Sequence, residues 1–101
     1  MTGASIEAGE GGRLYLRGEV TFSTVPDVWE RARRLFDDSA EMIVDLGDVE
    51  RADSAGLALL VEWMRAAKRR DTAIRFLNMP AQMLAIARVS SLDQILPLGR
   101  D

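Results

Sequence analysis

Apolar and polar positions repeat along the chain with two different periods, and each change of period marks an expected structural element. Residues 14–19 alternate apolar and polar side chains, which is typical of a strand, and a shorter run at residues 5–8 precedes them. Gly9-Glu10-Gly11-Gly12 separates the two runs and supplies residues that tolerate the positive φ angles of a tight turn. The pattern predicts a β-hairpin at the start of the chain.

Helical spacing begins after this hairpin. Thr24, Pro26 and Asp27 provide a hydroxyl cap, a proline in the first turn and an acidic residue three positions after the cap. From there to about Asp37 the apolar residues fall on one arc of a helix, which places Trp29 in the core. The residues on this arc are Val25, Val28, Trp29, Ala32, Leu35 and Phe36.

Two more strands and a third helix are expected further along the chain. Residues 41–46 are typical of a buried strand that Gly47-Asp48 ends, and residues 72–77 form another strand. Asn78-Met79-Pro80 opens a helix through about Val89, and residues 90–96 add a short helical turn.

The segment from Ser54 to Arg70 is the clearest helix of the chain, because it lacks proline, has no glycine after Gly56 and ends in basic residues. Its apolar arc spans roughly 220°, twice the width that one core face needs. We therefore expect a second stripe, formed by Leu59, Trp63 and Ala66, to bind a partner. The alternative is that Trp63 lies under a neighbouring helix of the same chain.

The order of these elements predicts the fold class α/β. We expect residues 1–101 to form a single domain, with a mixed β-sheet of about four strands and helices packed mainly on one face. A chain of 101 residues with 48% hydrophobic residues suits one modest core.

Composition excludes several classes of function. A net charge of −3 and a pI near 4.9 argue against nucleic-acid binding. The absence of cysteine and histidine excludes disulfides, thiolate metal sites and imidazole general bases, and we expect no cofactor and no enzymatic activity. No secretory signal or long apolar segment is present, so we expect a cytoplasmic protein without direct membrane insertion.

The turn Asp53-Ser54-Ala55-Gly56 lies between an expected strand and the clearest helix. On local chemistry it is a helix start, capped by Asp53 or Ser54, with Gly56 allowing a neighbouring backbone to approach. A hydroxyl in the first helical turn also lies at the positive end of the dipole, so Ser54 is a candidate phosphoacceptor. A catalytic serine is disfavoured because nothing in a histidine-free chain is placed to activate it. A weaker rival hypothesis is that carboxylates after the strand bind Mg²⁺ and accept a phosphoryl group, and the candidates are Asp45, Asp48 and Asp53.

The run from Val44 to Leu60 resembles STAS domains, the family of anti-sigma-factor antagonists, in which a strand ending in Asp-Leu precedes Asp-Ser/Thr-x-Gly-Leu at a helix start. Within the family, residues 56–60, Asn78-Met79-Pro80 and residues 92–97 are most similar to the STAS subunits of bacterial Mla phospholipid-transport ABC complexes. The order of the expected elements fits this fold over essentially the whole chain.

The resemblance implies a non-catalytic subunit that binds the cytosolic ATPase subunit MlaF, and through it the membrane permease, and so is held peripherally at the inner membrane. The complex would maintain the lipid asymmetry of the outer membrane. The expected partner-binding residues are Asp53, Ser54, Ala55, Leu59, Trp63 and Ala66. The alternative is an anti-sigma-factor antagonist. In such a protein, unphosphorylated Ser54 would permit binding of a kinase that is also the anti-sigma factor, and phosphorylation of Ser54 would release that kinase. Ala55 departs from the second Ser/Thr of many antagonists, which weakens this alternative.

Overall fold

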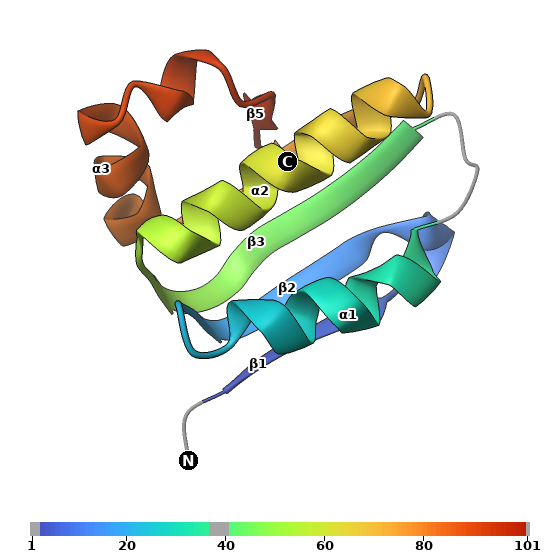
Figure 1. The fold of residues 1–101 in the computed structure, drawn as a ribbon, viewed down its shortest axis with the longest axis horizontal. Helices are drawn as coiled ribbons and strands as arrows, with labels where there is room; N and C mark the ends of the chain where they lie inside the picture. The colour runs from blue at the N-terminus through green and yellow to red at the C-terminus, as the bar shows by residue number, and fades with distance from the viewer. Residues whose placement is uncertain (1–2, 37–40, 101) are drawn as a thin grey trace.

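A mixed sheet of five strands forms the centre of the molecule, in a computed structural model that describes residues 3–36 and 41–100 (Figure 1). The strands lie side by side in chain order, with β1 antiparallel to β2 and the other neighbours parallel. Their bounds are β1 Ala4–Ala8, β2 Leu14–Val20, β3 Glu41–Ala52, β4 Ala73–Leu77 and β5 Leu98–Gly99. The α/β class and the mixed sheet are thus confirmed.

The sheet has five strands, whereas about four were expected from the sequence. The additional strand, β5, has only two residues, which are too few to show an alternation of apolar and polar side chains. It forms because the free edge of β4 offers backbone groups to pair. The N–H of Phe76 donates to the carbonyl of Pro97 at 2.9 Å, and the N–H of Asn78 donates to the carbonyl of Gly99 at 3.0 Å.

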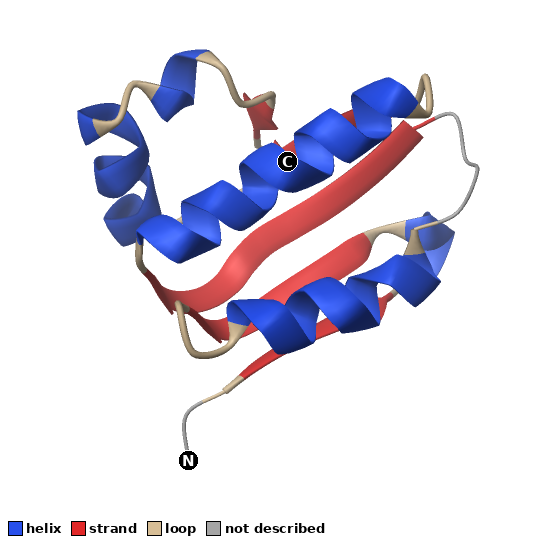
Figure 2. Cartoon of the chain, viewed as in Figure 1, coloured by secondary structure: helices blue, strands red, loops and turns tan. Residues whose placement is uncertain are grey.

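Two helices run side by side across one face of the sheet, and their N-termini lie at the same end (Figures 1 and 2). These are α1, Val25–Leu35, and α2, Ser54–Arg69, while α3, Ala81–Val89, lies beside the start of α2. Short 3-10 turns, η1 Glu10–Gly12 and η2 Leu92–Gln94, complete the described elements. The hairpin is confirmed, with Gly11 and Gly12 at φ angles of 68° and 78°.

Two helix starts differ from the sequence prediction. The hydroxyl of Thr24 caps no helical N–H, because it donates to the carbonyl of Glu19 at 2.7 Å and accepts from the N–H of Thr21 at 2.9 Å. The third helix begins after Pro80, since Asn78 adopts a left-handed φ of 63° and its amide donates to Asp45. The expected end of the first helix at Asp37 lies outside the described residues.

β3 continues to Ala52, so the prediction that Gly47-Asp48 ends this strand is wrong. The N–H of Gly47 donates to the Asp45 carboxylate at 2.8 Å, and the pairing of β2 with β3 shifts register beside this point. The glycine therefore marks an irregularity within a strand that β2 keeps paired as far as Ala52.

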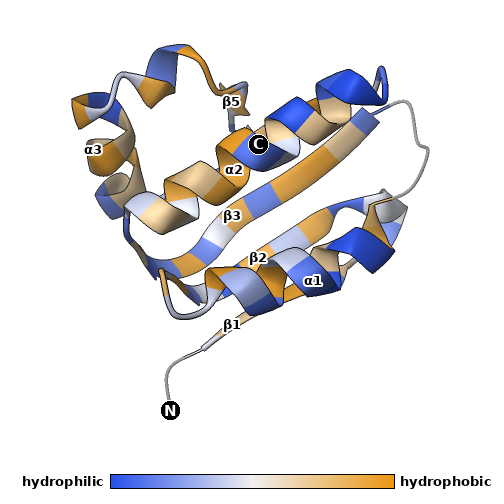
Figure 3. Ribbon diagram, in the orientation of Figure 1, coloured by the Kyte–Doolittle hydropathy of each residue, from blue (hydrophilic) through white to orange (hydrophobic). Residues whose placement is uncertain are grey.

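The core lies between the sheet and the two parallel helices. Leu16, Val44 and Phe76 from the sheet and Val28 and Leu60 from the helices are completely buried. Figure 3 shows hydrophobic residues along the centre of β3 and the first half of α2, and hydrophilic residues at the C-terminal ends of α1 and α2. No helix among the described residues is long and apolar enough to cross a bilayer.

Candidate functional site

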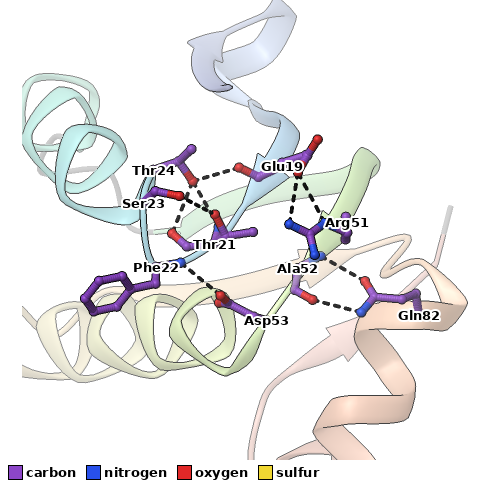
Figure 4. A network of polar contacts seen from close by, with 9 residues as sticks. All are labelled: Glu19, Thr21, Phe22, Ser23, Thr24, Arg51, Ala52, Asp53 and Gln82. Carbon is purple, nitrogen blue, oxygen red and sulfur yellow. Dashed lines mark hydrogen bonds and ion pairs between the residues drawn. The ribbon is translucent and has the colours of Figure 1, made fainter. Parts of the chain in front are cut away.

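Asp53 joins the starts of α1 and α2 at one end of the molecule (Figure 4). It precedes α2 in an extended conformation, and its Oδ1 atom accepts from the N–H groups of Ala55 at 2.9 Å and Gly56 at 3.3 Å. Its Oδ2 atom accepts from the N–H of Phe22, in the loop before α1, at 3.0 Å. One carboxylate therefore caps α2 and ties it to a loop that lies 31 residues earlier in the chain.

These hydrogen bonds determine the ionisation of Asp53. Partial burial raises the pKa of its carboxyl, but the N–H groups of Phe22, Gly56 and Ala55 and the nearby charge of Arg51 together outweigh that effect. The pKa of Asp53 consequently lies below its ordinary value, and the carboxylate form is the one that the folded state favours.

Gly56 brings the first turn of α2 against β2. A Cβ atom at this position would lie 2.5 Å from the carbonyl oxygen of Val20, a distance that real Cβ atoms do not tolerate. The absence of a side chain therefore lets α2 start directly beside the end of β2, which confirms the close approach expected from the sequence.

Ser54 is the first residue of α2 and is exposed to solvent. Its position at the positive end of the α2 dipole would stabilise an added phosphate. The structure thus leaves Ser54 accessible to a partner or to a modifying enzyme, and both roles remain predictions.

Leu59 and Trp63, two of the three residues of the stripe expected to bind a partner, are each only 2% exposed in the isolated chain. α1 lies alongside α2, and the ring of Phe36 at its end packs against Trp63 with a centroid distance of 5.3 Å. The sheet and α1 together cover the wide apolar arc, which is the alternative considered from the sequence. Ala66 is half-buried at the same helix–helix seam. The role of Leu59, Trp63 and Ala66 in partner binding stays a prediction.

An apolar groove of about 410 Å³ remains open between the first halves of α1 and α2. α1 contributes three of its residues and α2 four. The lining residues are Val25, Pro26, Trp29, Ala55, Ala58, Leu59 and Glu62. Two expected partner-binding residues, Ala55 and Leu59, thus meet α1 in this groove, and Trp29 is half-buried in it rather than fully in the core.

Phe22 is a surface residue that the sequence reasoning missed. Its side chain is 82% exposed, although the hydrogen bond from its N–H to Asp53 holds its backbone in place. A large aromatic residue in the short polar segment between a strand and a helix cap was the available signal. An exposed, well-held aromatic residue is typical of a protein-binding surface.

The three aspartates of the rival hypothesis do not share a site. Asp45 accepts from Arg13 at 3.1 Å and from the Asn78 amide at 3.3 Å, and Asp48 pairs with Arg17 at 3.3 Å. Within the described part of the chain, no three acidic residues are grouped as metal ligands would be.

Two further contacts support this end of β3. Arg51 pairs with Glu19 of β2 at 3.2 Å, and the side-chain amide of Gln82 on α3 exchanges two hydrogen bonds with the backbone of Ala52 (Figure 4).

This arrangement of sheet, paired helices and capped turn is the STAS fold. The structure superposes on the unphosphorylated anti-sigma factor antagonist SpoIIAA with a TM-score of 0.73 at 15% identity, over 97% of this chain and 87% of that one. An anti-sigma factor antagonist from Mycobacterium paratuberculosis gives the same TM-score at 21% identity, over 94% of this chain and 82% of the other.

Sequence comparison narrows the class to one family. Residues 5–97 match the family model described as MlaB, STAS domain, and the chain belongs to this family. It is similar to the intermembrane phospholipid transport system binding protein MlaB of Haemophilus influenzae, with 31% identity over 85 residues, which cover 79% of this chain and 80% of that protein.

Proposed function

We propose that this chain is the non-catalytic STAS subunit of an Mla-type phospholipid-transport ABC complex, and that it binds the cytosolic ATPase subunit, MlaF. Through this contact it would be held at the inner membrane, next to the permease, and contribute to outer-membrane lipid asymmetry. The similarity to a relative named for intermembrane phospholipid transport supports the assignment to this system.

The apolar groove between α1 and α2 is the observation that carries the binding role. Its walls are nearly all apolar, and Ser54 and Phe22 lie exposed at the helix starts beside it. Apolar surfaces of this kind favour long-lived protein–protein contacts over reversible, charge-dominated ones. Asp53 would contribute by holding the two helix starts in register.

Support of the ATPase would follow from mass action. A subunit that binds only the folded or assembly-competent form of its partner shifts the equilibrium towards that form. No reaction at the groove is required, and the chain would hydrolyse nothing itself.

Exposure of Ser54 at the start of α2 favours a second candidate function. In this alternative the chain is an anti-sigma-factor antagonist, and a phosphate on Ser54 would place about −1.5 to −2 charges on the surface that its partner contacts. Its structural neighbours include such antagonists, but at 15% and 21% identity they establish only the fold.

The first experiment is affinity purification of the tagged chain from its native cells after gentle membrane solubilisation, with mass spectrometry of its partners and of Ser54. We expect an ABC ATPase with its permease and an unmodified Ser54. A soluble kinase-like ATPase together with a phosphorylated Ser54 would instead establish the antagonist.

The second experiment measures the affinity of purified variants for the MlaF-like ATPase. We expect Phe22→Ala to weaken binding at least tenfold, whereas Val89→Ala, a truncation of an 88% exposed residue outside the site, should leave it unchanged. Ser54→Asp should weaken binding and Ser54→Ala should not, because only the former adds charge to the contact. Equal affinities for all four variants would rule out this surface.

A further inference from the structure

We propose that Gln82 is a positioning residue for the partner-binding turn, acting from α3 through the backbone of Ala52. The Oε1 atom of Gln82 accepts from the N–H of Ala52 at 2.8 Å, and its Nε2 atom donates to the carbonyl of the same residue at 2.8 Å. This inference rests on the proposed function, because it concerns what holds the proposed ATPase-binding surface in its shape.

The position of Ala52 in the sheet explains why such a residue is needed. On one side, β2 pairs with β3 as far as Val20 opposite Ala52, whereas on the other side the described pairing with β4 covers only residues 41–45 of β3. Ala52 is 3% exposed, and its one N–H and one carbonyl bond to Gln82 while the neighbouring N–H of Asp53 bonds to Val20 of β2, so without Gln82 both groups of Ala52 would need another partner within the protein. A carboxamide presents one acceptor and one donor in a plane, as a peptide group does, and Gln82 therefore takes the place of a missing strand.

Ala52 is also the residue directly before Asp53. The Asp53 carboxylate satisfies three N–H groups on two separate segments, at 2.9, 3.0 and 3.3 Å, and a small displacement of its backbone would lengthen some of these bonds. On the β2 side, the N–H of Asp53 itself lies 3.4 Å from the carbonyl of Val20, a long hydrogen bond. The Gln82 contact is thus the short, two-bond restraint on the backbone that leads into the turn.

The contact requires both an acceptor and a donor on the side chain of residue 82, and substitutions can remove them together or one at a time. Gln82→Leu keeps most of the side-chain volume but removes both polar groups. Gln82→Glu keeps an acceptor for the N–H of Ala52 but turns a carboxylate oxygen towards the Ala52 carbonyl, where two acceptors repel. Neither variant changes a residue of the proposed interface.

Amide hydrogen exchange and chemical shifts of the isolated 101-residue chain test the positioning directly. In Gln82→Leu we expect at least tenfold faster exchange at Ala52, with shifted amide signals at Phe22, Ala55 and Gly56. In Gln82→Glu at neutral pH, which keeps an acceptor for the N–H of Ala52, we expect the same three signals to shift and exchange at Ala52 to rise less than in Gln82→Leu. Ala85→Gly, at an exposed position of the same helix, is the control, because it weakens α3 without touching the contact. It should lower the melting temperature and leave those three signals in place.

Affinity for the MlaF-like ATPase is the second readout. If the turn has its binding-competent geometry only part of the time, the apparent affinity falls by that fraction. We therefore expect the Kd to rise three- to tenfold in both Gln82 variants and to stay unchanged in Ala85→Gly. Unmoved signals at Phe22, Ala55 and Gly56, or a Kd equal to that of the unchanged chain, would overturn the positioning role. A chain that binds no ATPase at all would refute the proposed function, while the exchange data would still decide whether Gln82 positions the turn.

Discussion

Asp53 offers the sharpest test of how the two helix starts are held together, because its two carboxylate oxygens serve different segments. Asp53→Ala removes the cap of α2 and the link to the Phe22 loop. Asp53→Asn keeps an oxygen that can cap α2, but it removes the charge and places an NH₂ group where the Phe22 N–H needs an acceptor. The two variants therefore separate the effect of the α2 cap from the effect of the hydrogen bond between Phe22 and Asp53.

The free energy of unfolding should fall by about 2 kcal/mol in Asp53→Ala. The lost cap accounts for about 1 kcal/mol. The charge at the positive end of α2 contributes about 0.5 kcal/mol. The exposed bond to Phe22, for which water partly substitutes, contributes about 0.5 kcal/mol more. Asp53→Asn retains the first contribution and should lose about 1 kcal/mol.

Urea unfolding followed by circular dichroism between pH 3 and pH 8 measures both losses. The pKa of Asp53 is lower in the folded state, so its ionised form stabilises the protein at every pH above the ordinary carboxyl range. That stabilisation is lost as the pH falls below about 4, through the lowered pKa of the folded state. We therefore expect the difference between the unchanged chain and Asp53→Asn to be constant from pH 5 to 8 and to shrink below pH 4.

Two results would refute this reasoning. One is an Asp53→Ala variant with a free energy of unfolding within about 0.3 kcal/mol of the unchanged chain, less than the smallest loss expected from a missing cap. The other is a difference between Asp53→Asn and the unchanged chain that is as large at pH 3 as at pH 7, which would mean that charge plays no part.

Three further substitutions test the packing around the site by the same unfolding measurement. Gly56→Ala should cost about 1–3 kcal/mol, because its Cβ atom would displace α2 from the Val20 carbonyl, and a neutral outcome would contradict the close packing. Trp63→Ala should cost about 3–5 kcal/mol by opening a cavity beside Phe36; an unchanged stability with lost ATPase binding would instead restore its predicted role as a docking residue. Thr24→Val should cost about 1–2 kcal/mol through its two lost hydrogen bonds, and no loss would show that water replaces them.

Local chemistry in the sequence was sufficient for most of the elements. The glycine-rich hairpin, the apolar arc of α1 and the capped start of α2 each depend on residues within a few positions of one another. The Asp53 cap and the close approach at Gly56 belong to this group, because helix starts and tight contacts have short-range signatures. The sequence therefore predicted the fold class and the place of the turn.

Only the tertiary structure decided which surfaces stay open. The period of α2 measures the width of its apolar arc but does not say which neighbour covers each side, so the burial of Trp63 under α1 had no signal in the spacing. The links from Asp53 to Phe22 and from Gln82 to Ala52 join residues about 30 positions apart. Such pairs depend on how sheet and helices are stacked, and a periodicity that repeats every two or 3.6 residues carries no information about them.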